Sequence, residues 1–376
     1  MKRLIYFFAP TLFLCQSLFS QYAVQPNARK VQVAILFDTS NSMDGLIDQA
    51  KSRIWSIVNE MSNLRYQGQM PTIEIALYDY GNSTLTAESG YIRQQVALTN
   101  DLDVISQKLF ALTTNGGDEY CGAVIQKSMQ DLNWSVNPND LKMIYIAGNE
   151  PFNQGSVPFR EVCTTASTRD IFINTIYCGD RDQGIREFWQ DCASLAKGDY
   201  FNINSDAQVR QIATPYDGEI GIYNDSLNRT YYGYGSMGQV KKSLQKEQDF
   251  NASNQAPSVA AERAIVKSKG SYSNSGWDLV DAVDKDGKNI QEMEESELPD
   301  EFKGKTAEQR VELLDSIRAD RARFQSKIGE LANKRQEFIT EELKKETTGG
   351  VDDFGTSVNN SMLKRAKEIG FETEVP

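Results

Sequence analysis

The sequence contains no histidine among its 376 residues. That absence excludes Ser-His-Asp and Cys-His nucleophilic centres, and it also excludes zinc or iron sites that depend on imidazole ligands. The cysteines form no Cys-x-x-Cys pair, so a redox or zinc motif of that kind is missing as well. Several large classes of enzyme are therefore ruled out by composition alone.

The sequence also has fewer basic than acidic residues. The chain has 40 Lys and Arg residues against 52 Asp and Glu residues, which gives a net charge of −12 at pH 7. Nucleic-acid binding relies on basic side chains that neutralise phosphates, and docking on anionic lipid has the same requirement. The sequence therefore predicts no nucleic-acid partner, and no motif in it indicates a small-molecule substrate.

Long apolar runs are scarce, and the one that stands out lies at the N-terminus, at 4–19. Lys2 and Arg3 precede it, and Ser20-Gln21 follows as a suitable cleavage point, a pattern typical of a secretory signal peptide. An uncleaved membrane anchor is the alternative. We expect an exported protein, periplasmic or extracellular, in which residues 1–20 form the signal peptide and 21–30 a linker.

Removal of the signal peptide leaves an even number of cysteines, namely Cys121, Cys163, Cys178 and Cys192. An even number in an exported chain is compatible with two disulfides. Three pairings are open, and buried free thiols remain an alternative to any of them.

A polar loop follows the first strong strand pattern of the chain. The apolar run 31–37 predicts a buried strand, and 43–64 predicts an amphipathic helix. Between them, Asp38, Ser40 and Ser42 supply one carboxylate and two hydroxyls at alternate positions. Hard oxygen ligands of this kind suit Mg²⁺, or Mn²⁺ or Ca²⁺. The alternative is a helix cap, because the same residue types accept hydrogen bonds from free backbone N–H groups.

Strand and helix patterns alternate from about residue 31 to 214, which predicts an α/β domain with a doubly wound, mostly parallel sheet flanked by helices. We expect an antiparallel strand at 91–98, a single helix at 185–196 and a closing helix at 206–212. Ligands of such sheets bind at the carboxyl ends of strands, and the first strand ends at Asp38.

The remainder of the chain predicts an α-helical C-terminal region. We expect a mixed connector with helices packing on the α/β domain at 215–288, an acidic linker at 289–304 and helices at 305–376. The segment 216–238 contains no clean strand run. The Gly-x-Gly-x-x-Gly match at 233–238 follows a poor strand and is interpreted as a connector. A long helix at 305–346 carries an apolar stripe interrupted by Arg321 and Arg335, which favours packing within the chain over a dimeric coiled coil.

Residues 31–214 resemble a von Willebrand factor A-type (VWA) domain, and Asp38, Ser40 and Ser42 match the Asp-x-Ser-x-Ser element of its metal-ion-dependent adhesion site, the MIDAS. The segment 116–119, Gly-Gly-Asp-Glu, is similar to the family's second metal loop. The resemblance implies that Asp118 lies near the metal.

Two features of the resemblance stay open. Thr113 and Thr114 lie just before the second loop and could serve instead of Asp118. The family usually closes its central strand with Asp, whereas this sequence has Gly148 there. Asn149 or Glu150, which also carry oxygen acceptors, are the candidate replacements.

The resemblance implies a function as well as a fold. In the family the cation keeps one open position, and a protein partner fills it with a carboxylate, so binding needs no chemical step and no catalytic residue. Segments 147–152 and 277–280 resemble bacterial exported VWA-type proteins with a helical C-terminal region. We expect a metal-dependent adhesion or scaffold protein that is not an enzyme. The alternatives are a metal-free scaffold of the cell envelope and a metal-assisted hydrolase.

Overall fold

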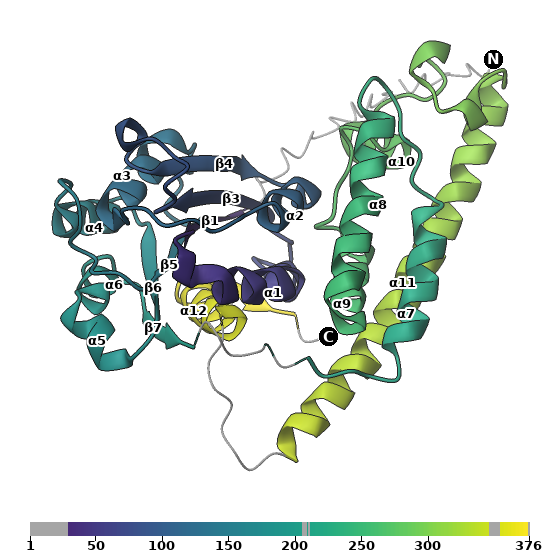
Figure 1. Ribbon diagram of the computed structural model, residues 1–376. Coiled ribbons are helices and arrows are strands. Elements are labelled where there is room, and N and C mark those ends of the chain that lie inside the picture. Colours follow the sequence, from purple (N-terminus) through teal and green to yellow (C-terminus); the bar gives the residue numbers. More distant parts are fainter. Residues whose placement is uncertain (1–28, 205–208, 210, 346–353, 375–376) are drawn as a thin grey trace, which may run out of the picture.

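A computed structural model describes residues 29–204, 209, 211–345 and 354–374. The predicted signal peptide, most of the predicted linker and part of the predicted helix at 206–212 lie outside these ranges. An α/β domain and a bundle of long helices, here called the helical arm (217–344), lie side by side (Figure 1).

The described residues form a six-stranded sheet in the order β4-β3-β1-β5-β6-β7. All neighbouring strands are parallel except β3 and β4, which are antiparallel as expected. The doubly wound, mostly parallel fold predicted from the sequence is therefore confirmed. The strands are β1 (Lys30–Asp38), β3 (Thr72–Tyr80), β4 (Ile92–Thr99), β5 (Leu141–Gly148), β6 (Phe172–Cys178) and β7 (Tyr200–Ile203).

Strand β1 lies in the middle of the sheet and is buried from Val31 to Asp38. Because side chains alternate between the two faces of a strand, Val33 and Phe37 enter one core and Leu36 enters the other. Burial on both faces explains why this strand is a continuous apolar run instead of an alternating pattern.

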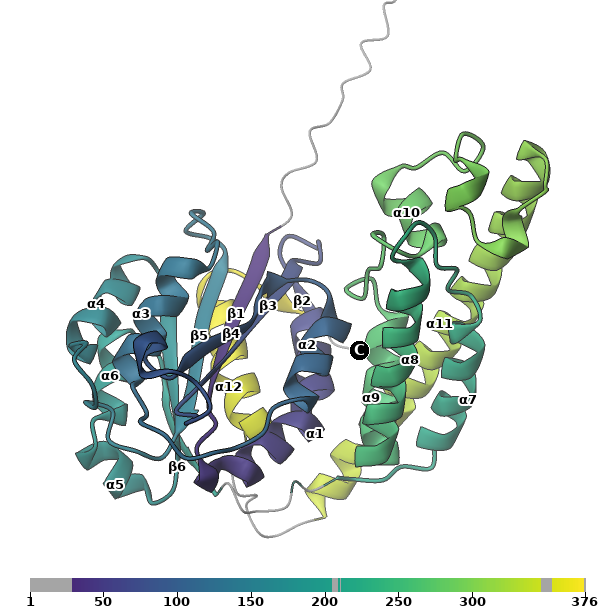
Figure 2. The same cartoon turned by 45° about the horizontal axis from the view of Figure 1, so that its top comes forward.

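Helices cover both faces of the sheet (Figure 2). One face carries α1, α2 and α12, and the other carries α3, α4 and α6, while α5 lies against β7. Their bounds are α1 (Asp44–Ser62), α2 (Leu102–Phe110), α3 (Cys121–Asp131), α4 (Phe159–Thr168), α5 (Arg181–Arg186), α6 (Trp189–Leu195) and α12 (Phe354–Glu368).

The single helix expected at 185–196 is wrong, because the chain forms α5 and α6 with a break between them. Phe188 has a positive φ of 70°, which no helix interior adopts. Its ring packs beside Phe159, and the guanidinium of Arg160 lies 4.9 Å from its centroid. Tertiary packing of an aromatic ring therefore overrides the local helical pattern.

The last described helix returns to the α/β domain. Helix α12 packs on α1, β5 and β6, and the rings of Phe37 and Phe354 lie 5.3 Å apart. The Tyr145 hydroxyl donates a hydrogen bond to the Val358 carbonyl (3.1 Å), and β8 (Glu372–Thr373) pairs with β2 (Leu64–Arg65). The domain boundaries drawn from the sequence stay a prediction. On these contacts we propose that 354–374 complete the α/β domain and that the arm is an insertion.

The arm consists of α7 (Asp217–Asn228), α8 (Gly238–Gln255), α9 (Pro257–Ser268), α10 (Leu279–Asp286) and α11 (Ala307–Lys344), with short 3₁₀ turns at Glu295–Glu297 and Asp300–Phe302 between α10 and α11. Two further 3₁₀ turns, Asn41–Met43 and Ala87–Ser89, belong to the α/β domain. Helix α7 forms in the segment 216–238, where the sequence shows no clean strand run and predicts no helix. Gly218 and Gly221 obscure its pattern, and burial of Ile220 and Leu227 offsets their cost.

The apolar stripe of α11 packs within the chain, as predicted, against α7 and α9. The two arginines that interrupt it are buried and paired. Arg321 binds Asp278 (2.7 Å), and Arg335 binds Asp217 (2.9 Å). These ion pairs explain how a long helix buries charge along its packed face.

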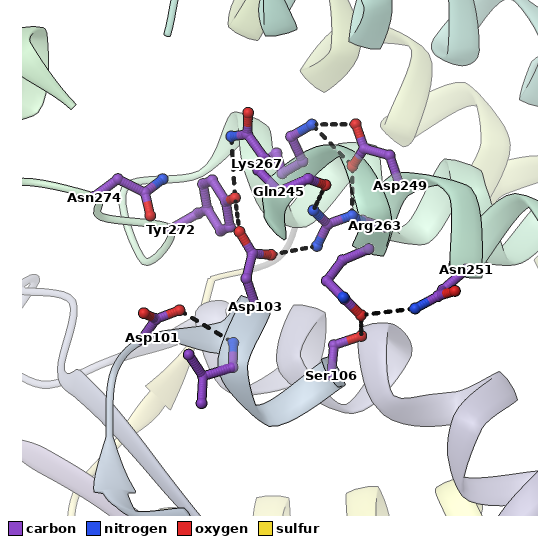
Figure 3. Close-up of polar contacts among 12 residues, drawn as sticks. Asp101, Asp103, Ser106, Gln245, Asp249, Asn251, Arg263, Lys267, Tyr272 and Asn274 are labelled. Carbon is purple, nitrogen blue, oxygen red and sulfur yellow. Dashed lines mark hydrogen bonds and ion pairs between the residues drawn. The ribbon is translucent and has the colours of Figure 1, made fainter. Parts of the chain in front are cut away.

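A buried polar cluster, here called the interface network (Asp103, Asp249, Arg263, Lys267 and Tyr272), joins the arm to the α/β domain (Figure 3). Arg263 of α9 binds Asp103 of α2 (Nη1 to Oδ1, 2.8 Å), and the Tyr272 hydroxyl donates to the other Asp103 oxygen (2.6 Å). Lys267 binds Asp249 (2.8 Å), which also accepts from Arg263 Nε. Every carboxylate in the network has a basic partner.

One disulfide, Cys163–Cys192, joins α4 to α6 across 29 residues of chain. Cys121 and Cys178 are buried outside any disulfide, so the structure forms one of the two bridges that four cysteines allow. In the part of the chain that the structure describes, no helix is long and apolar enough to cross a membrane.

Candidate metal centre

The polar loop opens at Asp38, the last residue of β1, which is fully buried between β3 and β5. Its Oδ1 accepts a hydrogen bond from the Ser40 backbone N–H (2.7 Å). Its Oδ2 is also buried, yet it has no hydrogen-bond partner among the described residues. A buried carboxylate oxygen without a partner carries a large desolvation cost, so this atom is suited to a ligand that the protein does not itself provide.

The two serines and Asn149 lie together beside Asp38. The Ser40 and Ser42 hydroxyl oxygens are 3.3 Å apart, and Asn149 Nδ2 donates to Ser42 Oγ (3.0 Å). The Asn149 Oδ1 atom is buried without a partner among the described residues. Neither the 3₁₀ turn at Asn41–Met43 nor α1 receives a side-chain cap, so the serines do not act as helix caps here.

The second loop brings Glu119, and not Asp118, against Asp38. Glu119 is 7% exposed, and a Cβ placed on Gly81 would lie 2.8 Å from Glu119 Cγ and 2.9 Å from Asp38 Oδ1. Asp118 accepts an exposed hydrogen bond from the Tyr120 hydroxyl (3.1 Å). Gly81, with a φ of +75°, therefore packs against the side chains of both Asp38 and Glu119, where no larger residue would fit.

The threonines before the second loop have other partners. Thr114 Oγ1 donates to Asp44 Oδ1 at the start of α1 (2.5 Å). The Thr113 carbonyl accepts from Asn82 Nδ2 (3.0 Å). These contacts hold the second loop against the first and leave Glu119 as its buried acidic group.

Tyr80 explains why Gly148 closes the central strand. Tyr80 lies beside Asp38 in the register of β1 and β3, and its hydroxyl donates to the Ala147 carbonyl (3.1 Å). A Cβ on Gly148 would lie 2.8 Å from that hydroxyl and 3.1 Å from Asp38 Oδ2. The tyrosine hydroxyl thus fills the space that a larger side chain would need.

Glu150 lies at the rim. Its carboxylate accepts a weak hydrogen bond from Gln154 (3.3 Å), and its backbone carbonyl accepts from the Trp189 indole (2.9 Å). It has no hydrogen bond to Ser40, Ser42 or Asn149 among the described contacts. It contributes to the site through its charge.

Three acidic side chains, Asp38, Glu119 and Glu150, repel one another at this site. Burial, followed by repulsion from Glu150, raises the pKa of Asp38 to about 7. Burial, followed by repulsion from Asp38 and Glu150, raises the pKa of Glu119 to about 8. A divalent cation beside Asp38 would relieve both the desolvation and the repulsion.

The ligand set fits a hard cation. Asp38 Oδ2, the two serine hydroxyls and Asn149 Oδ1 are all oxygen atoms, the ligands that Mg²⁺, Mn²⁺ and Ca²⁺ prefer. Across the described ranges, no three Cys, Asp or Glu side chains gather closely enough to hold a metal by themselves. A cation here would therefore depend on the hydroxyls, the amide and water to complete its shell.

Of the predicted ligands, the structure brings Asp38, Ser40, Ser42 and Asn149 together, with Glu150 at the rim and Asp118 directed toward Tyr120. Glu119 and Tyr80, which the sequence does not identify as site residues, also lie beside Asp38. Glu119 directly follows Asp118 in the predicted loop, so a pattern of loop residues could have included it. Tyr80 carried no such signal, because an aromatic residue at a strand end is ordinary core.

Neither a family model nor a curated protein matches the sequence. Solved structures do match. The conserved hypothetical protein BatB from Bacteroides thetaiotaomicron is 17% identical, with a TM-score of 0.35, over 46% of this chain and 90% of that one. The SpRpn10 VWA domain is 18% identical, with a TM-score of 0.37, over 47% and 90%.

A third match is proximal thread matrix protein 1 from the mussel byssus, with a zinc-occupied MIDAS motif. It is 13% identical, with a TM-score of 0.35, over 46% of this chain and 42% of that one. Scores this low carry no argument about function. The assignment of the fold rests on the strand order, on the helices over both faces and on the loop that follows β1.

Proposed function

We propose that this chain, whose α/β domain has the VWA-type fold, binds a protein partner through a divalent cation held at the end of β1. The buried Asp38 Oδ2 carries the proposal, because it is an anionic ligand atom that no described residue satisfies. The adjoining hydroxyls of Ser40 and Ser42 and the free Asn149 Oδ1 supply further oxygen ligands.

Each residue has a distinct part in such a site. Asp38 supplies the negative charge, and its hydrogen bond from the Ser40 N–H fixes the orientation of the carboxylate. Ser42 is held by Asn149, so β5 and the loop after β1 are joined at the site. The bound cation supplies an attraction for one more anionic oxygen, which we assign to an Asp or Glu side chain of the partner.

The acidic residues beyond Asp38 set the charge of the site. We assign the role expected for Asp118 to Glu119, which lies next to Asp38, and we place Glu150 at the rim. Mg²⁺ suits these oxygen ligands because it keeps exchangeable waters, and Mn²⁺ and Ca²⁺ are close substitutes. No described group forms a nucleophile and base pair at this site, and we propose no chemical step.

We place the protein outside the cytoplasm. The N-terminal pattern is that of a secretory signal peptide, and the disulfide between α4 and α6 needs an oxidising compartment to persist. Both observations are consistent with a periplasmic or extracellular adhesion or scaffold role.

One observation favours a second candidate, a metal-free scaffold. The Tyr80 hydroxyl occupies the space beside Gly148, so the site lacks the third anion that the family usually provides. Fewer anionic ligands weaken cation binding. In that case the loop after β1 would be a structural remnant, and partner binding would not respond to a chelator.

Calorimetric titration with Mg²⁺, Mn²⁺ and Ca²⁺ separates the two candidates. We expect saturable binding to the native chain and at least tenfold weaker binding to Asp38→Asn. The exposed Asp225→Asn variant on α7 is a matched control and should bind like the native chain. Equal cation affinity in native and Asp38→Asn chains would contradict the assignment of Asp38 as a metal ligand.

Partner capture from a cell-envelope extract then tests the second half of the proposal. The native chain should retain its partner in Mg²⁺ and release it in EDTA, whereas Asp38→Asn should fail to capture it in either buffer. A partner that binds both chains equally, with or without EDTA, supports the metal-free scaffold.

A further inference from the structure

A pocket of about 630 Å³ lies where the arm meets the α/β domain. Helix α1 and strand β8 form one side of it, and α9 and α11 form the other. Figure 2 shows α9 lying between α1 and α11. Pockets at the junction of two structural units are a common location for ligand sites. This one is formed by different residues from those of the metal centre.

Gly329, in the middle of α11, lines an open part of the pocket. A Cβ on Gly329 would meet no heavy atom within 4 Å. Glycine in a helix interior destabilises the helix relative to alanine, and here there is room for the methyl group. Packing therefore does not require the glycine, which leaves space above α11.

The basic side chains of the pocket are already engaged. Arg335 binds Asp217 and Glu262, and Arg65 binds Glu374. Lys269 donates to the Asn63 Oδ1 atom (2.8 Å) and to the Asn59 carbonyl (3.3 Å). An anionic ligand would have to displace these contacts.

The acceptors of the pocket are not all engaged. Among the described residues, the Glu60 carboxylate of α1 forms no hydrogen bond and no ion pair within 4 Å, and Lys269, which lines the same pocket, acts on it only through its charge. Burial, followed by repulsion from Glu262, raises the pKa of Glu60, and Lys269 offsets only part of that effect. An unpaired and partly desolvated carboxylate attracts a hydrogen-bond donor with positive charge.

Asn59 provides a second, independent acceptor. This residue is 6% exposed, its Nδ2 donates to Glu262 Oε2 (2.6 Å), and its Oδ1 is buried with no partner in the described ranges. It precedes Glu60 on α1 and lines the same pocket. Two adjacent acceptors without donors point to one ligand that brings donors to both.

We propose that this pocket binds a small organic cation, an alkylammonium or guanidinium group, through the Glu60 carboxylate and the Asn59 side-chain carbonyl. Such groups carry two or more N–H donors and a full positive charge, which matches the unsatisfied acceptors. The cation can be a free small molecule or the side chain of a basic residue on another protein, and both present the same chemistry.

The test uses the full chain and calorimetry with two sets of probes. Free arginine and spermidine represent small molecules, and capped Gly-Arg-Gly and Gly-Lys-Gly peptides represent basic side chains. We expect saturable binding of at least one set. Citrulline, in which a neutral ureido group replaces the guanidinium, should bind at least tenfold more weakly than arginine. Binding of the capped peptides assigns a protein source, and binding of the free cations alone assigns a small molecule.

Variants locate the site. Glu60→Gln should weaken binding at least tenfold, whereas Glu337→Gln, an exposed change on α11, should leave it unchanged. Gly329→Phe should fill the pocket and abolish binding, and Gly329→Ala should retain it. Circular dichroism melts confirm that each variant is folded. Absence of saturable binding for every probe, or equal binding to native and Glu60→Gln chains, would overturn the proposal.

The result does not depend on the metal centre. Asp38→Asn should bind the organic cations like the native chain, because Asp38 and Glu60 belong to different sites. Failure of divalent-cation binding with retained arginine binding would therefore count against the proposed function alone, and the reverse result would count against this pocket alone.

Discussion

The candidate metal centre and the interface network both bury carboxylates. The network pairs each carboxylate with a basic side chain, whereas the candidate metal centre leaves the Asp38 Oδ2 atom without a partner among the described residues. In the network, Lys267 and Arg263 overcome the effect of burial and hold the pKa of Asp249 well below its usual value. At the metal centre, burial and neighbouring acids raise the pKa of Asp38 to about 7. The ion pairs of Asp249 favour a structural role, whereas the Asp38 Oδ2 atom, which has no partner among the described residues, is the basis of the binding role proposed above.

Breaking the network should have the largest effect. Arg263→Met leaves the buried Asp103 carboxylate without its main ionic partner, and it also removes the guanidinium that lies 4.5 Å from the Trp55 ring centroid. We expect a loss of about 3–5 kcal/mol in the free energy of unfolding. Urea denaturation measures this loss. Arg323→Met, which removes an exposed arginine paired with Asp320, is the matched control and should cost at most about 1 kcal/mol.

The free energy of unfolding should depend on pH because of the buried Asp38 carboxylate. Without metal, folded Asp38 keeps its proton up to about pH 7, whereas its ordinary pKa is 3.8. The folded state binds more protons in that window, so the free energy of unfolding should fall as pH rises, by up to about 1.4 kcal/mol per pH unit. Denaturation in EDTA across this window measures the slope.

Two comparisons check the origin of that slope. Asp38→Asn should reduce the slope without abolishing it, because Glu119, whose pKa is raised from 4.5 to about 8, contributes a slope of similar size. Saturating Mg²⁺ should flatten it in the native chain. An equal slope in native and Asp38→Asn chains would show that the buried carboxylate does not cause it.

Substitutions at Gly148 and Tyr80 test whether the Tyr80 hydroxyl occupies the space of an additional carboxylate at the candidate metal centre. Gly148→Asp should destabilise the fold by about 1–3 kcal/mol, because its Cβ would lie 2.8 Å from the Tyr80 hydroxyl. Adding Tyr80→Phe removes that oxygen and should recover part of the loss. If the double variant also binds Mg²⁺ more tightly than the native chain, the hydroxyl occupies the place of an anion; unchanged affinity would contradict this.

The smallest effect is expected at Glu60, the unpaired acid of the interface pocket. Glu60→Gln removes a charge that burial disfavours, so the free energy of unfolding should stay within about 0.5 kcal/mol of the native value or rise slightly. Urea denaturation at pH 7 measures it. A loss comparable to that of Arg263→Met would mean that Glu60 is paired in solution like the acids of the network.

Much of the α/β domain could be predicted from the sequence because its signals are local. The run 31–37 and the polar residues after it define a strand and loop without reference to distant parts of the chain. The features that were missed depend on long-range contacts. Phe188 breaks a helix to pack on Phe159, and Tyr80 fills the space of a larger residue at Gly148.

The sequence could identify only some residues of the candidate metal centre, for the same reason. The motif placed Asp38, Ser40 and Ser42, because residues in one short loop share a location. The choice between Asp118 and Glu119 depends on how the second loop packs against Gly81. Adjacent residues can point in different directions, so only three-dimensional packing decides between them.

The return of α12 also bears on how the polypeptide matures during synthesis. Phe354 packs on Phe37, a contact between positions more than 300 residues apart in the chain. Closing so long a loop carries an entropic cost and slows folding. The sheet face beneath α12, formed by β5 and β6, therefore stays uncovered until the ribosome has translated α12.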